Sequence, residues 1–321
     1  MKLVSFLTDG SVRAGMLQGN LVADIHAVSG GSLPKEMAAV IELGDEGLSE
    51  MRGLGPFSKG ETGVHELKDV TLKSPIPRPV SIRDFYAFEE HVKTARKRRG
   101  LDVVPEWYDI PVFYFTNHLA VKGPLDTVEK PADCGWLDYE LEIACVIGKE
   151  GRDITADEAD DHIYGYLIMN DWSARDIQKH EMKVGLGPAK GKDFATSLGP
   201  YLVTKDELEP YRQGDRYDLS MTAKVNGQLL SEGNYRDIHY TFGEMIERAS
   251  KGVTLYPGEV IGSGTVGTGC ILELGTEVHR WLEAGDVVEL EITGLGLLKN
   301  RIAERREGEV HVLSSTGEHT P

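Results

Sequence analysis

The pattern of hydrophobic and polar positions predicts a chain built mainly of β-strands. In the first 25 residues, short apolar runs alternate with the Asp-Gly and Gly-Asn pairs that favour tight turns. The stretch 37–43 has the apolar spacing of a helix. Beyond residue 79 the strand-like runs lie at 111–115, 141–148, 164–171, 220–227, 258–264, 270–275 and 287–296.

Few helical patterns interrupt these strands. The clearest lie at 84–99, 173–182 and 241–250. A doubly wound sheet would need regular alternation of strand and helix, which is missing. We therefore expect an α+β fold dominated by strands.

The segment "SPIPRP" at 74–79 predicts a domain boundary, because its three prolines block both a helix and a central strand. We expect a small β-rich N-terminal domain at 1–72 and a catalytic domain at 73–305. The last residues, 306–321, are polar and are expected to form a flexible tail.

Composition excludes several classes of function. The net charge of −17 disfavours binding to nucleic acid or to an anionic membrane. No apolar run approaches the roughly 20 residues of a membrane span, and the N-terminus does not have the pattern of a signal peptide. The three cysteines show no disulfide or metal spacing, so we expect a reducing, cytoplasmic environment.

Two local motifs have competing interpretations. The basic run at 93–99 is either a solvated helix face or an anchor for an anionic substrate. "GSGTVG" at 262–267 matches the G-x-G-x-x-G pattern of dinucleotide-binding loops. Because a strand-like run follows it where such a loop needs a helix, we expect a turn between strands.

The acidic stretch "WLDYELE" at 136–142 is the first candidate for chemistry. As a single strand it would place Asp138, Glu140 and Glu142 on one face, with neighbours about 7 Å apart. Two carboxylates about 5 Å apart in a half-buried setting repel by about 3 kcal/mol. The stretch is either an exposed face or a set of oxygen ligands for Mg²⁺, Mn²⁺ or Ca²⁺. Asp171, at the end of an apolar run, is well placed to join such a site.

A wider constellation carries a family resemblance. The motifs are "RDFYAFEEH" (83–91), "DYELE" (138–142), "NDWSARDIQ" (170–178), "GPAKGKDFATSLGP" (187–200) and "GSGTVGTGCILELG" (262–275). In this order they resemble the fumarylacetoacetate hydrolase family, over roughly residues 75–303. The resemblance implies a mixed β-sandwich roll for the large domain, a homodimer and an enzyme that acts on a small anionic oxo acid.

The resemblance also implies a set of site residues. A divalent cation, Mg²⁺ or alternatively Mn²⁺ or Ca²⁺, would be bound by Asp84, Glu140, Glu142 and Asp171. Asp138 is left out of this set and is expected either behind the ligands or facing solvent. A lone helical histidine is more often structural, but here His91 matches the family's general base, paired with Glu273. The other catalytic residues would be Arg175, Gln178 and Lys192, and substrate would contact Tyr86, Arg98, Arg99, Tyr114, Gln178 and Thr265.

The implied activity is metal-dependent hydrolysis of a C–C bond in a β-diketo or 2,4-dioxo acid during catabolism of aromatic compounds. Fumarylacetoacetate, fumarylpyruvate and acylpyruvates are the candidate substrates. Met182 stands where the family has a tyrosine, which speaks against fumarylacetoacetate itself. Oxaloacetate decarboxylation and 2-oxo-dienoate isomerisation or hydration are alternatives within the family. A non-catalytic protein with a structural Ca²⁺ site is a third.

Overall fold

Strands dominate the computed structural model, which describes residues 1–303. The expected strand-dominated α+β class is confirmed. The predicted tail at 306–321 lies outside the described residues.

The largest sheet has 12 strands and is mixed, because β8 and β15 as well as β21 and β6 pair parallel while its other pairs are antiparallel. Its neighbours in order are β4 (Val64–Glu66), β3 (Leu21–Asp24), β2 (Ser11–Gln18), β1 (Lys2–Thr8), β15 (Thr196–Thr204), β13 (Ile163–Asp171), β11 (Leu141–Ile147), β21 (Val260–Gly262), β6 (Ile82–Phe85) and β7 (Phe113–Phe115). Two more strands lie off this path, β5 (Thr71–Lys73) beside β1 and β8 (Val121–Lys122) beside β15.

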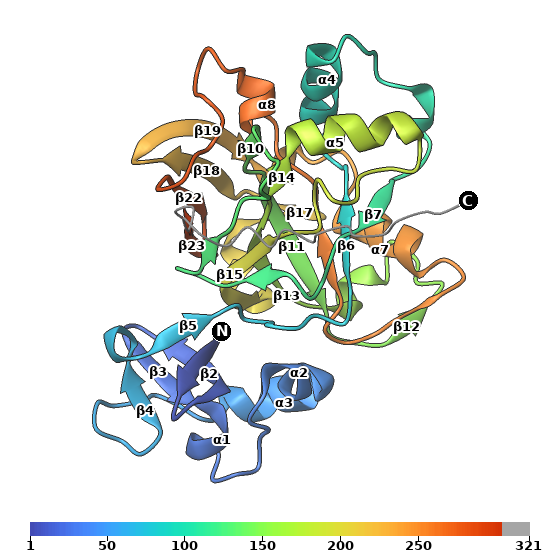
Figure 1. Cartoon of the computed structure of the whole chain (residues 1–321). Coiled ribbons are helices and arrows are strands. Elements are labelled where there is room, and N and C mark those ends of the chain that lie inside the picture. Colours follow the sequence, from blue (N-terminus) through green and yellow to red (C-terminus); the bar gives the residue numbers. More distant parts are fainter. Residues whose placement is uncertain (304–321) are drawn as a thin grey trace, which may run out of the picture.

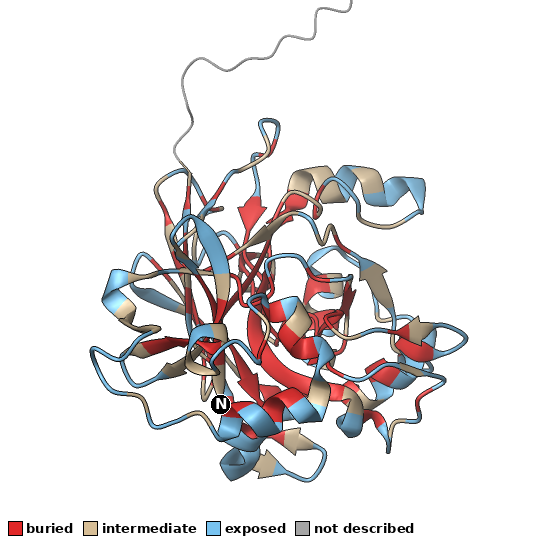
Figure 2. Ribbon diagram, turned by 90° about the horizontal axis from the view of Figure 1, so that it is seen from below, coloured by how far each residue is buried: buried red, intermediate tan, exposed pale blue. Residues whose placement is uncertain are grey.

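A five-stranded sheet forms the second layer. It contains β19 (Gln228–Asn234), β18 (Ser220–Val225), β22 (Val287–Ile292), β23 (Gly296–Ile302) and β9 (Thr127–Val128). Every residue of β11 and β13 is buried, whereas β18 and β22 alternate between buried and more accessible positions. Figure 2 shows the buried residues gathered in the middle of the molecule. Because every position of β11 and β13 is buried, these two strands are covered on both faces of the sheet.

Residues 1–73 continue the large sheet, because β1 pairs with β15 at Lys2↔Val203 and Leu3↔Leu202. They also carry α1 (Ile25–Val28), α2 (Met37–Glu42) and α3 (Gly44–Arg52), which confirms the helix expected at 37–43. Figure 1 shows this part as a lobe at one end of the molecule. The domain boundary after residue 72 stays a proposal.

Three helices gather at the opposite end of the sandwich, namely α4 (Glu89–Arg98), α5 (Arg175–Glu181) and α8 (Ile271–Leu274). The remaining helices are α6 (Lys205–Leu208) and α7 (Phe242–Ser250), together with the short 3₁₀ turns η1 (Leu67–Asp69), η2 (Pro105–Tyr108), η3 (Ala159–His162), η4 (Met182–Val184), η5 (Glu209–Tyr211) and η6 (Tyr235–Asp237). Three two-stranded pairs complete the fold: β10 (Leu137–Asp138) with β14 (Ser173–Ala174), β12 (Gly151–Arg152) with β20 (Thr254–Leu255), and β16 (Arg212–Gln213) with β17 (Arg216–Tyr217). No helix within residues 1–303 has the length and apolar character needed to cross a membrane.

Three predicted elements differ from the structure. The helix expected at 84–99 begins only at Glu89, because residues 82–85 form β6 between β21 and β7. The single strand expected at 136–142 is interrupted at Tyr139 and Glu140, where the Glu140 N–H donates to the Asn170 side chain. The run at 270–275 contains a helix, not a strand. In each case tertiary hydrogen bonds override the local pattern.

Candidate active site

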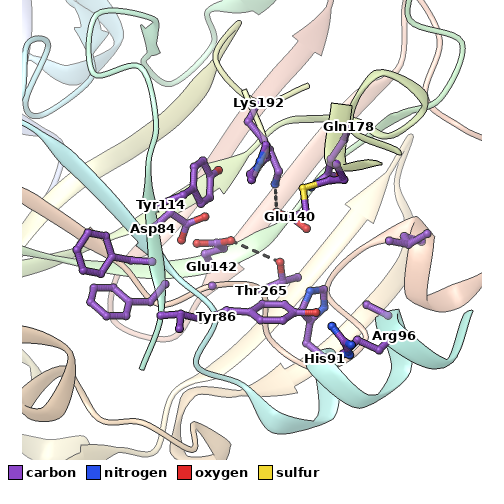
Figure 3. Close-up of a pocket in the computed structure, with 18 of the residues that line it drawn as sticks. Asp84, Tyr86, His91, Arg96, Tyr114, Glu140, Glu142, Gln178, Lys192 and Thr265 are labelled. Atoms are coloured by element: carbon purple, nitrogen blue, oxygen red, sulfur yellow. Dashed lines mark hydrogen bonds and ion pairs between the residues drawn. The ribbon is translucent and has the colours of Figure 1, made fainter. Parts of the chain in front are cut away.

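A cavity of about 310 Å³ is lined in part by residues of α4, α5 and α8. Its walls come from both the large sheet and the three helices. Figure 3 shows acidic side chains on one part of the wall, with His91 and Tyr86 on another. The lining residues are Asp84, Phe85, Tyr86, His91, Ala95, Arg96, Arg99, Val112, Phe113, Tyr114, Glu140, Glu142, Arg175, Gln178, Met182, Pro188, Lys192, Gly264, Thr265 and Leu272.

Adjacent strands bring three carboxylates together. Asp84 lies on β6, Glu142 on β11 and Asp171 at the end of β13, and these strands are neighbours in the large sheet with β21 between β11 and β6. One carboxylate oxygen from each lies within 4.8 Å of the others. Gly262 on β21 leaves room for Asp84, since a Cβ there would lie 2.7 Å from Asp84 Oδ1. The sheet therefore builds an acidic cluster from residues far apart in sequence.

The acidic cluster is buried and carries oxygens without partners. Within residues 1–303, Asp84 Oδ1, Glu142 Oε2 and Asp171 Oδ1 have no hydrogen-bond donor. Burial, followed by repulsion from Asp171, raises the pKa of Asp84 well above its usual range. Burial and then Asp84 raise the pKa of Glu142 in the same way. Ionisation of all three buried carboxylates at this spacing is unfavourable without a compensating positive charge.

These residues fit a hard divalent cation. Mg²⁺, Mn²⁺ and Ca²⁺ prefer oxygen ligands, and the three unpartnered oxygens belong to converging carboxylates. Asp84, Glu142 and Asp171 would hold the ion. Ligation by Glu140, the fourth residue of the predicted set, stays a prediction. The ion would add positive charge beside Asp84 and Glu142, whereas Asp171 is already in contact with Lys192.

Glu140 has different surroundings from the acidic cluster. Its Oε1 accepts a hydrogen bond of 2.7 Å from Arg175 Nη2, and its Oε2 accepts one from Lys192 Nζ. Although burial opposes ionisation, Arg175 and then Lys192 hold the pKa of Glu140 below its usual range. Lys192 Nζ also donates to Asp171 Oδ2, so this lysine bridges Glu140 and the cluster. Figure 3 shows the Lys192–Glu140 contact at the rim of the acidic group.

His91 and Glu273 form a buried pair. His91 Nδ1 lies 2.7 Å from Glu273 Oε2, and Glu273 Oε1 accepts a hydrogen bond of 3.1 Å from the Thr268 N–H. His91 comes from α4 and Glu273 from α8, two elements that sequence spacing does not relate. A carboxylate at Nδ1 orients the imidazole and leaves Nε2 available for proton transfer.

Two tyrosines and a threonine complete the polar lining. Tyr114 donates to Asp171 Oδ2 at 2.5 Å. The buried hydroxyl of Tyr86 has no hydrogen-bond partner among the described residues, and burial raises the pKa of Tyr86 to about 12. The Thr265 hydroxyl lies 3.4 Å from Glu142 Oε1. The predicted pair Arg175 and Gln178 shares one face of α5, where Arg175 Nη1 donates to Gln178 Oε1 at 3.2 Å.

The basic run of α4 splits into two groups. Arg96 and Arg99 line the cavity, and sequence reasoning missed Arg96. Arg98 is turned toward α8, where it donates to the Glu273 carbonyl at 3.2 Å and to the Leu274 carbonyl at 2.8 Å. Arg98 lies seven residues, about two helical turns, beyond His91, so both can face α8. The seven-residue spacing from His91 is the sequence signal that distinguishes Arg98 from the cavity-lining Arg96 and Arg99.

Asp138 is fully buried, so its solvent-facing alternative is wrong. It contacts Arg175 Nε at 2.9 Å and therefore lies behind Glu140 rather than in the cavity wall. The glycines of "GSGTVG" serve close packing. A Cβ at Gly264, which has φ of +76°, would lie 2.5 Å from the Phe85 carbonyl oxygen. The expected turn between two strands is instead a loop that joins β21 to the single helical turn of α8.

Comparison with known proteins adds family evidence to this geometry. The fumarylacetoacetate (FAA) hydrolase C-terminal model matches residues 81–303. The oxaloacetate tautomerase YisK of Bacillus subtilis (strain 168) is 32% identical over 280 residues, covering 84% of this chain and 87% of YisK. Among solved structures, a fumarylacetoacetate hydrolase from psychrophilic Exiguobacterium antarcticum has a TM-score of 0.73 and 28% identity, covering 95% of this chain and 100% of that one.

A 5-carboxymethyl-2-hydroxymuconate delta-isomerase from Mycobacterium smegmatis is also similar in structure. It has a TM-score of 0.67 and 27% identity, and the match covers 95% of this chain and 100% of the isomerase. The relatives are thus enzymes that bear different names on one fold. The chain belongs to the fumarylacetoacetate hydrolase family.

Proposed function

We propose that this protein is a divalent-metal-dependent enzyme that moves a proton at the carbon next to the carbonyl of a small 2-oxo dicarboxylic acid. Keto–enol tautomerisation of oxaloacetate is the best-supported reaction. The observation that carries this is the placement of the buried His91–Glu273 pair and the acidic cluster around one cavity.

The reaction follows from these groups. His91 Nε2 accepts the proton from the carbon next to the 2-oxo group, and the C–H electron pair forms the C=C bond of an enolate. Return of a proton to the enolate oxygen gives the enol, and the same steps reversed give the keto form. A divalent cation held by Asp84, Glu142 and Asp171 would stabilise the negative charge that develops on the substrate oxygens.

The cationic residues account for a dicarboxylate substrate. Arg96 and Arg99 line the same cavity as His91. They offer guanidinium groups to a carboxylate remote from the reacting carbon. Tyr86 offers a buried hydroxyl that has no hydrogen-bond partner in the part of the chain that the structure describes. The name and 32% identity of the relative YisK favour oxaloacetate among such acids.

Hydrolytic cleavage of a C–C bond in a 2,4-dioxo acid is the second candidate. It is favoured by the 28% identity to a fumarylacetoacetate hydrolase and by the same His91–Glu273 pair, which would then deprotonate a water molecule. Fumarylpyruvate, acylpyruvates and fumarylacetoacetate would be the substrates, in catabolism of aromatic compounds. Both candidates pass through an enolate, so the same acidic cluster would serve both.

A panel of substrates tests the two candidates. The rate of enol-to-keto conversion of oxaloacetate is followed by loss of the enol absorbance, with Mg²⁺, with Mn²⁺ and with EDTA. Cleavage of an acylpyruvate and of fumarylacetoacetate, and decarboxylation of oxaloacetate, are measured in parallel. Metal-dependent tautomerisation that exceeds the buffer rate is the expected result. Cleavage of a dioxo acid without tautomerisation would select the second candidate instead.

Chelation separates both candidates from a structural Ca²⁺ site. An enzyme loses turnover when EDTA removes its metal, whereas a purely structural site loses melting temperature alone. We also propose that the protein is a homodimer in the cytoplasm. Light scattering at micromolar concentration checks the dimer, and a monomer would contradict it.

A further inference from the structure

Asp138 is a buried carboxylate near the cavity that the proposed reaction does not use. It belongs neither to the cavity lining nor to the acidic cluster. Its Oδ1 accepts a hydrogen bond of 2.8 Å from the Ile271 N–H, and its Oδ2 accepts one of 3.0 Å from the Leu272 N–H. Oδ2 also accepts the 2.9 Å bond from Arg175 Nε. Three donors from two distant segments therefore converge on one side chain.

The first two of these donors form the start of α8, which has no cap of its own. The N-cap residue Cys270 makes no side-chain hydrogen bond to the backbone of the helix. In a capping box, an acidic residue at the third helical position would bond back to the N-cap N–H. Here that residue is Glu273, and its carboxylate contacts His91, the Thr268 N–H and the Cys270 thiol instead. Asp138 supplies the missing acceptor, and its negative charge suits the N-terminus of a helix.

The other end of α8 is held by a cation. Arg98 donates to the carbonyl groups of Glu273 and Leu274. A helix of four residues cannot stabilise itself, because nucleation costs more than one turn of hydrogen bonds returns. The position of Glu273 therefore depends on these contacts from β10 and α4.

Asp138 also reaches the opposite part of the site through Arg175. The Arg175 guanidinium donates to Asp138 through Nε and to Glu140 through Nη2. Both hydrogen bonds are buried, and together the two carboxylates fix the orientation of the planar guanidinium. Asp138 is thus the shared partner of the helix that carries Glu273 and of the arginine that fixes Glu140.

We propose that Asp138 is a positioning residue that sets Glu273 against His91 and, through Arg175, fixes Glu140 beside the metal cluster. This inference rests on the proposed function for its catalytic consequence, and its structural part stands on the contacts alone. Asp138 does not touch the substrate in this scheme. It acts by holding α8 and the Arg175 guanidinium in one fixed relation.

Asp138→Asn tests this role with little change in shape. An amide has one acceptor oxygen, so in either orientation its NH₂ group faces at least one of the three donors. We expect kcat to fall about 10–100-fold, the range typical for partners that orient the groups of a metal site, with a much smaller change in KM. Amide hydrogen exchange of a peptide spanning 268–275 should accelerate, since the caps of Ile271 and Leu272 are lost.

Asp286→Asn is the matched control. Asp286 is also a buried aspartate that accepts a backbone N–H, from Glu283 at 2.8 Å, and pairs with an arginine, Arg280. It does not line the cavity. This variant should lower the melting temperature while kcat, KM and exchange at 268–275 stay at wild-type values. An equal loss of kcat in both variants would make the Asp138 effect a matter of general stability and overturn the proposal.

A double-mutant cycle with Glu273→Gln shows whether Asp138 acts through Glu273. If it does, Asp138→Asn should cost at most about 3-fold further in the Glu273→Gln background, because the two changes then remove the same interaction. Fully multiplicative losses would overturn the link to Glu273.

A new cap provides the rescue. Cys270→Ser places a hydroxyl at the N-cap of α8, a position where serine is strongly preferred. In the Asp138→Asn background it should slow exchange at 268–275 and return part of the lost kcat. If Asp138→Asn alone does not fold, this double variant is the one measured. If neither variant folds, Asp138 is required for folding, and the proposed positioning role is overturned.

The exchange measurement needs no substrate. If the wild type transforms none of the oxo acids, the proposed function fails, while exchange at 268–275 still decides whether Asp138 holds α8. Unchanged exchange in Asp138→Asn would overturn the inference even in an active enzyme.

Discussion

Glu140 and Glu142 lie two residues apart, yet the fold gives them opposite electrostatic surroundings. Glu142 faces Asp84 and Asp171, and its pKa is raised by burial and by these carboxylates. Glu140 faces Arg175 and Lys192, which hold its pKa low against the effect of burial. One carboxylate is neutralised by fixed protein cations, and the other has an oxygen without any partner.

The difference shows how one short stretch of chain contributes both to the proposed metal site and to an ion-paired group beside it. The strand interruption at Tyr139 and Glu140 separates the two residues, so that Glu142 remains in the β11 ladder while Glu140 turns to α5. Because Lys192 contacts both Glu140 and Asp171, it marks the border between the two halves. The cluster of Asp84, Glu142 and Asp171 is where we propose that a divalent cation binds.

The largest effect is expected from Glu142→Gln. The change keeps size but removes one ligand charge, so Mg²⁺ affinity should fall by more than the roughly 10–100-fold that loss of an outer partner costs. Activity should be lost with it, while the fold is retained. Calorimetric titration with Mg²⁺ measures the effect. The control is Glu289→Gln, at a half-buried glutamate of β22 that pairs with Lys299 of β23. Unchanged Mg²⁺ binding would show that Glu142 is not a ligand.

His91→Asn should have the next largest effect on rate and should leave Mg²⁺ binding unchanged. Loss of a general base typically costs about 10²–10⁴-fold in rate. We expect this loss in tautomerisation or acylpyruvate hydrolysis, with Mg²⁺ affinity near the wild-type value. Decarboxylation of oxaloacetate needs no attacking water and should fall within about 10-fold, because the imidazole would serve only a protonation step. Equal losses in hydrolysis and decarboxylation would contradict water activation by His91.

The pH dependence of the metal-free protein should be a smaller effect. Asp84 and Glu142 have raised pKa values, so their contribution to stability is fully present below the unfolded-state pKa of about 4. It is lost as pH rises through the raised folded-state values. With EDTA, the melting temperature should therefore fall as pH rises above about 4, and Mg²⁺ should reverse the trend. Glu142→Gln should flatten the EDTA curve, and identical curves for both proteins would contradict the repulsion.

Much of the fold was predictable because most strands carry strong local signals. The runs at 141–148 and 164–171 predicted strands, and these are β11 and β13 in the structure. The error at 270–275 had a physical cause. The N–H groups of Ile271 and Leu272 bond to Asp138, which lies more than 130 residues away. No local pattern reports such a partner.

The site was predictable as a list of residues more than as an arrangement. The family motifs pointed to residues that the structure gathers at one cavity, including Asp84, His91 and Lys192. They did not reveal that Glu140 is paired with Arg175, nor that Asp138 supports α8. Those facts depend on which segments meet in space, and charge spacing along one strand carries no such information.

The smallest expected effects distinguish two neighbouring arginines. Arg99 lines the cavity, whereas Arg98 donates to the carbonyls at the end of α8 and pairs with the exposed Glu277. Arg99→Gln should raise KM for an oxo diacid about 10-fold with little change in kcat, because it removes ground-state and transition-state binding equally. Arg98→Gln should instead lower kcat a few-fold at constant KM, since it loosens the helix that carries Glu273.

Steady-state kinetics measures kcat and KM of both variants. A monocarboxylate such as pyruvate is added as a competing ligand. The monocarboxylate lacks the remote carboxylate, so its inhibition constant should not respond to Arg99→Gln. An Arg98 variant that raises KM while the Arg99 variant does not would reverse the assignment. It would place the substrate against α8, and the separation of α4 into a cavity-lining group and a helix-supporting arginine would then be wrong.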